Sequence, residues 1–259
     1  MKVVILAGGK GTRISEESIS KPKPMIEIGD KPILWHIMKI YSSFGFNDFI
    51  ICCGYKGYII KEYFADYYLH MSDVTFDFTE QNKMQIHNNV AEPWKVTLVD
   101  TGLETMTGGR IKRIQKYIPE GETFLMTYGD GVSDVDIDEL INFHNEKNAI
   151  ATMTIIQPDG RYGAVDVDIE SGKVKSFVEK PVGDGGWVNG GYFVLDYRIF
   201  EYLKEDTMVF EKEPLEKLTE LSALSAYKHY GYWQSMDSLR DKNTLEDVWK
   251  SGGAPWKKW

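Results

Sequence analysis

The sequence predicts an α/β fold with a mostly parallel central sheet flanked by helices, and three observations support this prediction. Residues 3–6 form a continuous apolar run of the kind found in buried parallel strands. Helical periodicity follows over residues 33–41, and a second buried strand is predicted over residues 48–53. Strand and helix patterns therefore alternate, which is typical of parallel strands joined by helical crossovers.

The boundaries of these first elements have local signals. The first strand ends before Gly8 and Gly9, and glycines stop a strand. Pro32 precedes the first helix and Gly45 closes it. Residues 57–68 predict a second helix after the second strand.

Later segments extend the same pattern over the whole chain. Alternating residues at 73–78 and 83–87 predict an inserted hairpin. Further strands are predicted at 95–100, 123–128, 149–157, 163–168, 173–179 and 191–195, and further helices at 109–117, 137–146, 213–221 and 238–250. The sequence contains no repeat, low-complexity segment or linker. We therefore expect one domain over residues 1–259, with a smaller C-terminal β-rich part.

The charge of the chain restricts its partners. There are 30 basic and 39 acidic residues, which gives a formal net charge of −9. Such a surface repels nucleic acids and anionic membranes, so we expect neither as a partner. The apolar run near the N-terminus is too short for a signal peptide or a membrane span, and we expect a cytoplasmic protein.

The cysteines and histidines predict no reactive or metal-binding centre. Cys52 and Cys53 are adjacent, so they offer no disulfide framework and are expected to pack on opposite faces of a strand. The five histidines show no metal-ligand spacing.

A glycine-rich segment follows the first strand. Gly8, Gly9 and Gly11 allow backbone N–H groups to approach a phosphate chain, and Arg13 can bind phosphate oxygens with its planar guanidinium. The segment is neither a dinucleotide fingerprint, because Ile14 replaces the third glycine, nor a Walker A loop. Taken alone, the glycines fit a plain strand-to-helix turn as well as they fit a phosphate-binding loop.

A second basic element follows closely at Lys21-Pro22-Lys23-Pro24. Between residues 10 and 24 there are four basic and two acidic side chains, a local charge of +2 in an acidic chain. This local excess indicates a binding site for an anion, although a solvated loop with rigid prolines is the simpler interpretation of the element alone.

Together these elements resemble a known family. Residues 6–13, followed by Lys23-Pro24-Met25, are similar to the signature of the sugar nucleotidyltransferases, also called nucleoside-diphosphate-sugar pyrophosphorylases, and the resemblance covers nearly the whole chain. Residues 97–102, 106–110, 128–131 and 233–237 resemble the branch that uses CTP and glucose 1-phosphate. Pro24 stands where the thymidylyl branch typically has glutamine, which favours the cytidylyl branch.

The resemblance implies a Rossmann-like nucleotidyltransferase fold and a specific reaction. The reaction is Mg²⁺-dependent transfer of CMP from CTP to α-D-glucose 1-phosphate, which gives CDP-glucose and pyrophosphate. Such a reaction is a first step towards CDP-linked deoxysugars for surface polysaccharide such as lipopolysaccharide O-antigen. The family also implies a homo-oligomer.

Two carboxylates are candidate metal ligands. Asp130 comes just after a predicted strand, at the edge where ligands bind in parallel sheets, and hard oxygen ligands suit Mg²⁺. The resemblance makes Asp130 and Asp237 the two metal aspartates. Without it, a turn is the simpler interpretation of Asp130, and an N-terminal helix cap is the alternative for Asp237, where the cap and the metal role are compatible.

The resemblance also assigns the remaining site residues. Arg13, Lys23 and Asp130 are the catalytic candidates. The predicted nucleotide contacts are Leu6, Ala7, Gly8, Gly9, Gly11, Thr12, Arg13, Lys23, Thr105, Arg110 and Gly129. The predicted sugar-phosphate contacts are Tyr162, Gly163, Glu179, Lys180 and Asn189, of which Glu179 would receive sugar hydroxyls and Lys180 would bind the phosphate.

Three alternatives remain open at this point. The first is the same chemistry with another base or sugar, as in a uridylyl- or thymidylyltransferase. The second is a metal-dependent glycosyltransferase that uses Asp134 and Asp136, although this pair precedes a helical pattern and predicts N-terminal capping charge. The third is a catalytically inactive nucleotide-binding regulator, which predicts loss of a metal aspartate or of the basic loop, and both are present.

Overall fold

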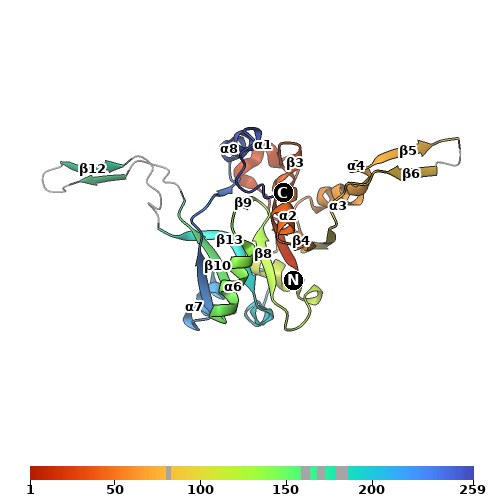
Figure 1. The fold of residues 1–259 in the computed structure, drawn as a ribbon. Coiled ribbons are helices and arrows are strands. Elements are labelled where there is room, and N and C mark those ends of the chain that lie inside the picture. Colours follow the sequence, from red (N-terminus) through yellow and green to blue (C-terminus); the bar gives the residue numbers. More distant parts are fainter. Residues whose placement is uncertain (80–82, 159–163, 168–172, 179–185) are drawn as a thin grey trace.

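The computed structural model describes residues 1–79, 83–158, 164–167, 173–178 and 186–259. A sheet that includes β4, β8, β10 and β13 lies at its centre (Figure 1). It has seven strands in the order β14-β10-β13-β8-β1-β4-β7. Four of the six neighbouring strand pairs are parallel, and β13 runs antiparallel to both of its neighbours. The prediction of a mostly parallel sheet is therefore confirmed. The strands are β1 (Val3–Ala7), β4 (Asp48–Cys53), β7 (Lys95–Asp100), β8 (Phe124–Tyr128), β10 (Ala151–Ile156), β13 (Val188–Leu195) and β14 (Leu224–Lys228).

The central strand β1 is buried on both faces, because every one of its side chains is apolar. Val3, Ile5 and Ala7 join one hydrophobic cluster, while Val4 and Leu6 join the other. This alternation places one core on each side of the sheet.

Helices cover both faces of the sheet. The helices α2 (Ile33–Ser43), α6 (Ile137–Lys147) and α8 (Leu239–Lys250) pack their apolar residues into the first cluster. The helices α5 (Thr107–Arg113) and α7 (Glu213–Glu220) do so in the second. Among the described residues, no helix is long and apolar enough to cross a membrane.

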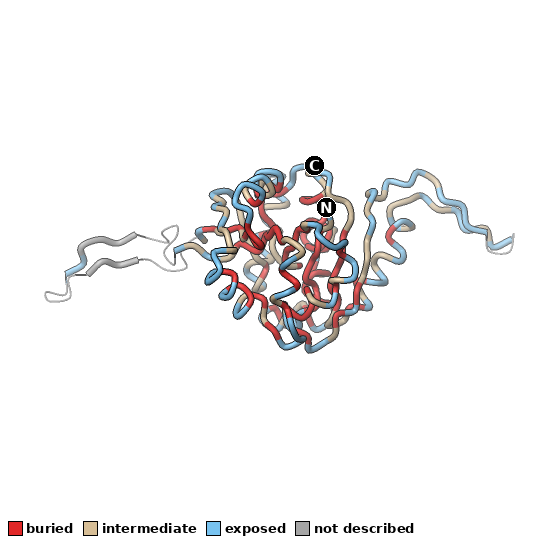
Figure 2. Tube along the Cα trace, turned by 90° about the horizontal axis from the view of Figure 1, so that it is seen from below, coloured by how far each residue is buried: buried red, intermediate tan, exposed pale blue. Residues whose placement is uncertain are grey.

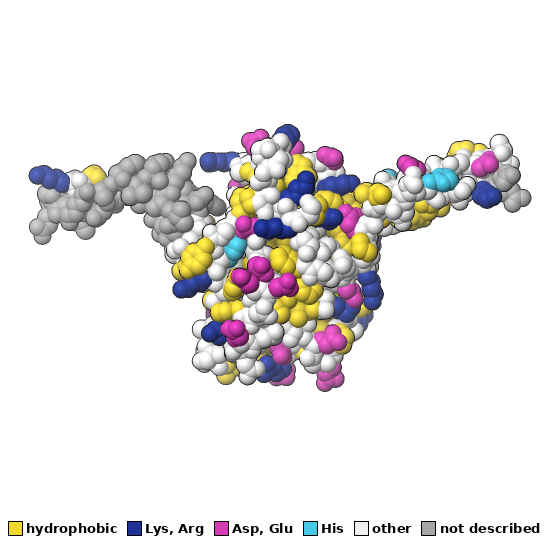
Figure 3. Space-filling model, in the orientation of Figure 1, with side chains coloured by type: hydrophobic (Ala, Val, Ile, Leu, Met, Phe, Trp, Pro, Cys, Tyr) yellow, Lys and Arg dark blue, Asp and Glu magenta, His cyan; other side chains and the backbone are white. Residues whose placement is uncertain are grey.

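The predicted inserted hairpin is confirmed. Strands β5 (Asp73–Asp77) and β6 (Lys83–His87) pair antiparallel and project from the body, next to the helices α3 (Gly57–Ala65) and α4 (Tyr67–His70) (Figures 1 and 2). The hairpin carries exposed apolar side chains, seen in yellow in Figure 3. They are Phe76, Phe78, Met84 and Ile86.

The remaining elements are short. They include the two-stranded sheets β2 (Glu27–Ile28) with β3 (Lys31–Pro32), β9 (Gly131–Ser133) with β15 (Trp233–Ser235), and β11 (Ala164–Val167) with β12 (Val174–Val178). Short helical turns are η1 (Thr12–Ile14), α1 (Ser15–Ser18), η2 (Lys23–Met25), η3 (Gln115–Tyr117) and η4 (Tyr197–Tyr202). The β9–β15 pair joins the two segments that carry the candidate metal ligands.

The structure also refines several predicted boundaries. The helix predicted over 57–68 is divided at Asp66 into α3 and α4, and the helix predicted over 109–117 begins at Thr107 and ends in the turn η3. The C-terminal β-rich part does not stand alone, because β10, β13 and β14 extend the central sheet. Strand β14 has no predicted counterpart, since only part of this edge strand is shielded from solvent and it lacks a continuous apolar run.

The two cysteines lie on opposite faces of β4, as the sequence predicts. Cys52 belongs to one hydrophobic cluster and Cys53 to the other. Burial raises the pKa of both thiols, that of Cys53 to about 11, so neither is a reactive thiolate near neutral pH.

Candidate active site

The candidate site lies at the carboxyl ends of the central parallel strands. The glycine-rich segment follows β1, and Gly129 and Asp130 follow the neighbouring strand β8. Because the two strands are parallel and paired, their carboxyl ends meet at one edge of the sheet. This is the edge at which ligands bind in α/β folds.

A cavity of about 390 Å³ opens over this edge. Every residue that the sequence predicts for nucleotide binding lines it. These are Leu6, Ala7, Gly8, Gly9, Gly11, Thr12, Arg13, Lys23, Thr105, Arg110 and Gly129, together with Asp130.

The glycine segment is held in place by Arg110, a buried residue of α5. Its guanidinium donates hydrogen bonds to the carbonyls of Gly8 at 3.0 Å and Gly102 at 2.8 Å, and to the hydroxyl of Thr101 at 2.7 Å. A Cβ atom on Gly8 would lie 2.1 Å from this guanidinium, so only glycine fits while Arg110 holds its present position. Burial lowers the pKa of Arg110, although the side chain stays charged at any neutral pH. Arg110 therefore shapes the cavity wall by anchoring the backbone.

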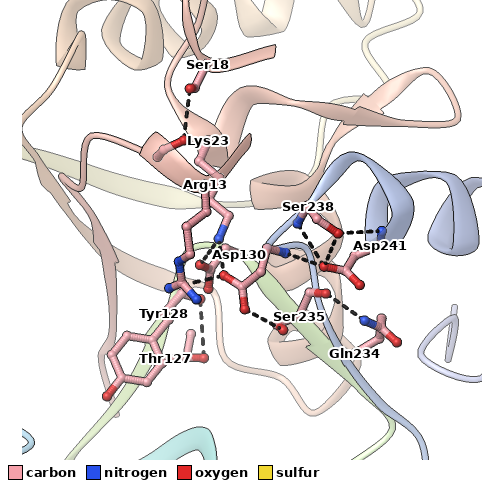
Figure 4. A network of polar contacts seen from close by, with 12 residues as sticks. Arg13, Ser18, Lys23, Thr127, Tyr128, Asp130, Gln234, Ser235, Ser238 and Asp241 are labelled. Atoms are coloured by element: carbon pink, nitrogen blue, oxygen red, sulfur yellow. Dashed lines mark hydrogen bonds and ion pairs between the residues drawn. The ribbon is translucent and has the colours of Figure 1, made fainter. Parts of the chain in front are cut away.

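Lys23 lies between the two predicted metal aspartates. Its Nζ atom is 2.6 Å from Oδ2 of Asp130 (Figure 4). The same atom is 2.8 Å from Oδ1 of Asp237. The Lys23 side chain is only 11% exposed. Burial alone lowers its pKa, but the adjacent Asp130 and Asp237 outweigh that effect, and the pKa of Lys23 is raised. Three residues far apart in sequence thus form one compact cluster of charges.

Asp237 reaches this cluster through the pairing of β15 with β9. The backbone N–H of Met236 donates to the carbonyl of Asp130 at 2.8 Å, which fixes the two segments side by side. Ser235 donates its hydroxyl to Asp237 at 3.1 Å. Burial raises the pKa of Asp237, but Lys23 and Arg13 lower it more strongly, and the net pKa is depressed.

The alternative role of Asp237 as a helix cap is wrong. Ser238 is the N-cap of α8, and it forms a capping box with Asp241. The carboxylate of Asp237 is therefore directed at Lys23 and Arg13.

Arg13 lies at the rim of the cluster. Its guanidinium is 3.3 Å from Asp237, and its side chain is 76% exposed. The side chain is therefore free to rearrange towards a ligand at low cost, since an exposed ion pair contributes little to stability.

A second cavity, of about 360 Å³, adjoins the first. The two share Arg13, Tyr128, Asp130 and Glu211 as lining residues. The predicted sugar contact Asn189 lines the second cavity, where its amide donates to the Tyr128 hydroxyl at 3.3 Å. The site thus has two compartments that meet at Arg13 and Asp130.

Glu211 is a site residue that the sequence does not reveal. Its carboxylate accepts hydrogen bonds from Tyr128 and from Thr107, the latter at 2.6 Å, on the boundary between the two cavities. Glu211 precedes the acidic first turn of α7, so in the sequence it is indistinguishable from ordinary capping charge. Only the tertiary fold brings it to the site.

Four predicted sugar-phosphate residues lie outside the described part of the structure. They are Tyr162, Gly163, Glu179 and Lys180. Their roles stay predictions, while Asn189 is the member of that set that the structure describes.

The Asp134-Val135-Asp136 triplet has structural roles. Asp136 is the N-cap of α6 and accepts from the backbone of Glu139 at 2.9 Å. Asp134 lies 3.0 Å from Nε2 of His229. The capping prediction for Asp136 is confirmed, and the triplet offers no support for a glycosyltransferase metal site.

The chemistry of the donor set fits Mg²⁺. Over the described residues no group of three or more acidic, histidine or cysteine side chains could hold a metal ion. Asp130 and Asp237 nevertheless both direct an oxygen at a single cation, the Lys23 ammonium. Mg²⁺ binds in this way, through one or two carboxylates completed by substrate phosphates and water.

Comparisons with known proteins show the family to which the chain belongs. Residues 2–250 match the Nucleotidyl transferase family. The chain is 58% identical over 259 residues to the glucose-1-phosphate cytidylyltransferase of Salmonella typhi, and 45% identical over 260 residues to the probable glucose-1-phosphate cytidylyltransferase of Bacillus subtilis, with all of each chain covered. The crystal structure of HddC from Yersinia pseudotuberculosis is similar with a TM-score of 0.68 and 28% identity, over 96% of this chain and 99% of that one.

Proposed function

Because this chain belongs to the nucleotidyl transferase family, we propose that it transfers CMP from CTP to α-D-glucose 1-phosphate and releases pyrophosphate. The observation that carries the proposal is the meeting of two cavities at Arg13 and Asp130. One cavity has the glycine-rich wall expected for a triphosphate, and the other has room for a sugar phosphate. The two cytidylyltransferase relatives, aligned over their full length, support CTP and glucose 1-phosphate as the substrates.

The proposed reaction needs no general base. A sugar phosphate has a second pKa near 6, so at neutral pH it is largely a dianion that can attack the α-phosphorus directly. This agrees with a site made of glycine, lysine, arginine and aspartate. Catalysis then consists mainly of in-line positioning and charge neutralisation.

The described residues have distinct parts in this scheme. The backbone of Gly8, Gly9 and Gly11 would hold the phosphate chain, and Arg13 and Lys23 would offset the negative charge where the two anionic substrates meet. Asp130 and Asp237 would hold Mg²⁺, which when bound supplies further positive charge to the phosphates. We assign the incoming sugar phosphate to Lys180 and the sugar hydroxyls to Glu179 and Asn189.

Selection of cytosine is the finer part of the proposal. Cytosine presents a donor at N4 and an acceptor at N3, whereas uracil and thymine present the reverse. The wrong base leaves buried polar groups unpaired at about 1–3 kcal/mol each, so two mismatches give a discrimination of roughly 100-fold or more. Backbone groups near Thr105, which is buried at the cavity wall, are our candidates for this contact.

The experiment is a matrix of pyrophosphate release. Four nucleoside triphosphates are combined with several sugar 1-phosphates, with and without Mg²⁺, and the Asp130→Asn protein is the control. The proposal predicts the highest kcat/KM for CTP with glucose 1-phosphate and no release without metal. If the kcat/KM values for CTP and UTP differed by only a few-fold, the proposed base specificity would be wrong, while the proposed reaction class would stand. Sugar transfer without pyrophosphate release would instead favour the glycosyltransferase.

We also expect a homo-oligomer. The exposed apolar side chains of the β5–β6 hairpin support this expectation, because apolar groups gathered on a projecting arm favour association. Light scattering coupled to size-exclusion chromatography measures the oligomeric state directly.

A further inference from the structure

Lys23 stands where the two candidate metal ligands converge. Its ammonium contacts Oδ2 of Asp130 at 2.6 Å and Oδ1 of Asp237 at 2.8 Å. An Mg²⁺ ion shared by these two oxygens would lie between the same carboxylates as the ammonium does, so the two cations compete for position and for the same negative charge. Lys23 must therefore move away before the two carboxylates can share Mg²⁺ at this place.

We propose that Lys23 is an internal cation that closes the metal site while the nucleotide cavity is empty, so that Mg²⁺ enters only together with nucleotide phosphates. The inference rests on the proposed function, and it concerns the order in which metal and nucleotide bind. Lys23 thus has a role in the ligand-free protein besides its contact with phosphate.

The charges of the cluster support this role. Lys23 and Arg13 carry two positive charges, which balance the two negative charges of Asp130 and Asp237. A divalent ion added to the intact cluster would meet a balanced site and the repulsion of a neighbouring ammonium. Because the Lys23 side chain is only 11% exposed, water and salt screen this repulsion weakly. The ligand-free cluster therefore disfavours Mg²⁺.

The nucleotide cavity provides the place to which Lys23 can move. Lys23 lines that cavity, so phosphate oxygens bound there lie within reach of its flexible four-carbon stem. Its backbone stays fixed, because η2 is closed by hydrogen bonds from Met25 to Pro22 and from Ile26 to Lys23. Every charged group keeps an oppositely charged partner in this exchange, because the carboxylates bind Mg²⁺ when the Lys23 ammonium binds phosphate oxygens.

The test is a titration of the nucleotide-free, full-length protein with Mn²⁺, followed by electron paramagnetic resonance of the free ion. Mn²⁺ is a suitable probe because it shares the preference of Mg²⁺ for carboxylate oxygen. The unaltered protein should bind Mn²⁺ weakly, and Lys23→Met should bind it at least about tenfold more tightly, because the competing charge is gone. Lys23→Gln should also bind Mn²⁺ more tightly than the unaltered protein does. Because glutamine keeps a hydrogen-bond donor for the aspartates, this variant provides the test if the methionine variant folds poorly.

Three controls separate occupation of the site from a general effect of charge. Lys21→Met removes a nearby ammonium that pairs with Glu27 at 2.9 Å, and it should bind Mn²⁺ like the unaltered protein. Arg13→Gln removes the exposed cation on Asp237 and should give a smaller gain than Lys23→Met. Asp130→Asn added to Lys23→Met should abolish the gain.

Equal Mn²⁺ affinity in the unaltered protein and both Lys23 variants would overturn the inference, as would a gain that survives Asp130→Asn. Neither result bears on the proposed reaction, because the titration contains no nucleotide. That reaction is judged separately, by pyrophosphate release from the unaltered protein.

Discussion

The guanidinium of Arg110 donates a hydrogen bond to the carbonyl of Gly8 at 3.0 Å, across 102 residues of sequence. The same guanidinium bonds to the carbonyls of Cys53 and Gly102, so it joins the chain at the ends of β1, β4 and β7. The glycine segment is thus positioned before any nucleotide binds.

Replacing Arg110 by lysine should destabilise the protein. A lysine ammonium cannot match the planar set of donors, and buried carbonyls lose their partners at a cost of about 1.5–3 kcal/mol. Urea unfolding measures the loss. Arg113→Lys on the same helix is the control, because Arg113 forms an exposed pair with Asp206 and should have little effect. Equal stability of the two variants would contradict the anchoring role.

Adjacent glycines should respond differently to alanine. The added Cβ of Gly8→Ala would lie 2.1 Å from Arg110, whereas a Cβ at Gly9 meets no atom within 4 Å. Gly8→Ala should therefore lower the melting temperature and weaken CTP binding together, while Gly9→Ala keeps the melting temperature of the unaltered protein. A stable Gly8→Ala protein would show that Arg110 can move aside.

Arg13→Ala should reduce kcat by about 10²–10³, the range for loss of one preorganised charge donor. Its stability should barely change, since the Arg13 side chain is 76% exposed. Steady-state pyrophosphate release and a thermal melt check both parts. Lys10→Ala is the control, because Lys10 pairs with Glu104 at the surface and should leave kcat nearly intact. Unchanged turnover in Arg13→Ala would end the assignment.

Asp130 and Asp237 should act as a unit. Each asparagine substitution should be severe, and the double substitution should be little worse than either alone, because both remove the same ion. The measurement is kcat/KM for the two single variants and the double variant. Losses that multiply would indicate separate roles for the two carboxylates.

Stability should fall on mild acidification because of His36. Burial lowers its pKa from 6.5 to about 4. The unfolded chain therefore takes up a proton at a higher pH than the folded protein does, so stability is fully present above about pH 6.5 and is lost as the pH falls towards 4. The slope for one such group is about 1.4 kcal/mol per pH unit. His36 Nε2 bonds to the carbonyl of Ile28 at 2.8 Å, which fixes the neutral ring in its pocket.

Urea unfolding at several pH values checks this slope. His36→Gln should reduce it, and the remainder should come partly from His144, whose pKa is also lowered by burial. An unchanged slope in His36→Gln would refute the assignment.

Much of the fold could be predicted because its signals are local. The strand β4 occupies the predicted residues 48–53, since its run of apolar side chains is unbroken and buried. The edge strand β14 could not be predicted, because its place beside β10 depends on a partner distant in sequence. The break at Asp66 has no proline or glycine to mark it.

The site could be predicted only in part, for a related reason. The glycine segment and Asp130 follow strands, so their place at the sheet edge is implied by the order of elements. The sequence predicts Lys23 as a nucleotide contact, but its contact with both aspartates depends on β15 pairing with β9. Glu211 lies in a connection before α7, and only packing brings it to the cavities.

The pairing of β9 with β15 also has a consequence for how the protein is made. Lys23 and Asp237 are 214 residues apart, so a ribosome adding about 5–20 residues per second synthesises the second about 10–40 s after the first. During that interval the nascent chain carries the glycine segment, and later Asp130, without the carboxylate that completes the cluster. The proposed phosphate-binding wall is therefore made before the proposed metal site is complete, and a chain released before β15 lacks the second aspartate altogether.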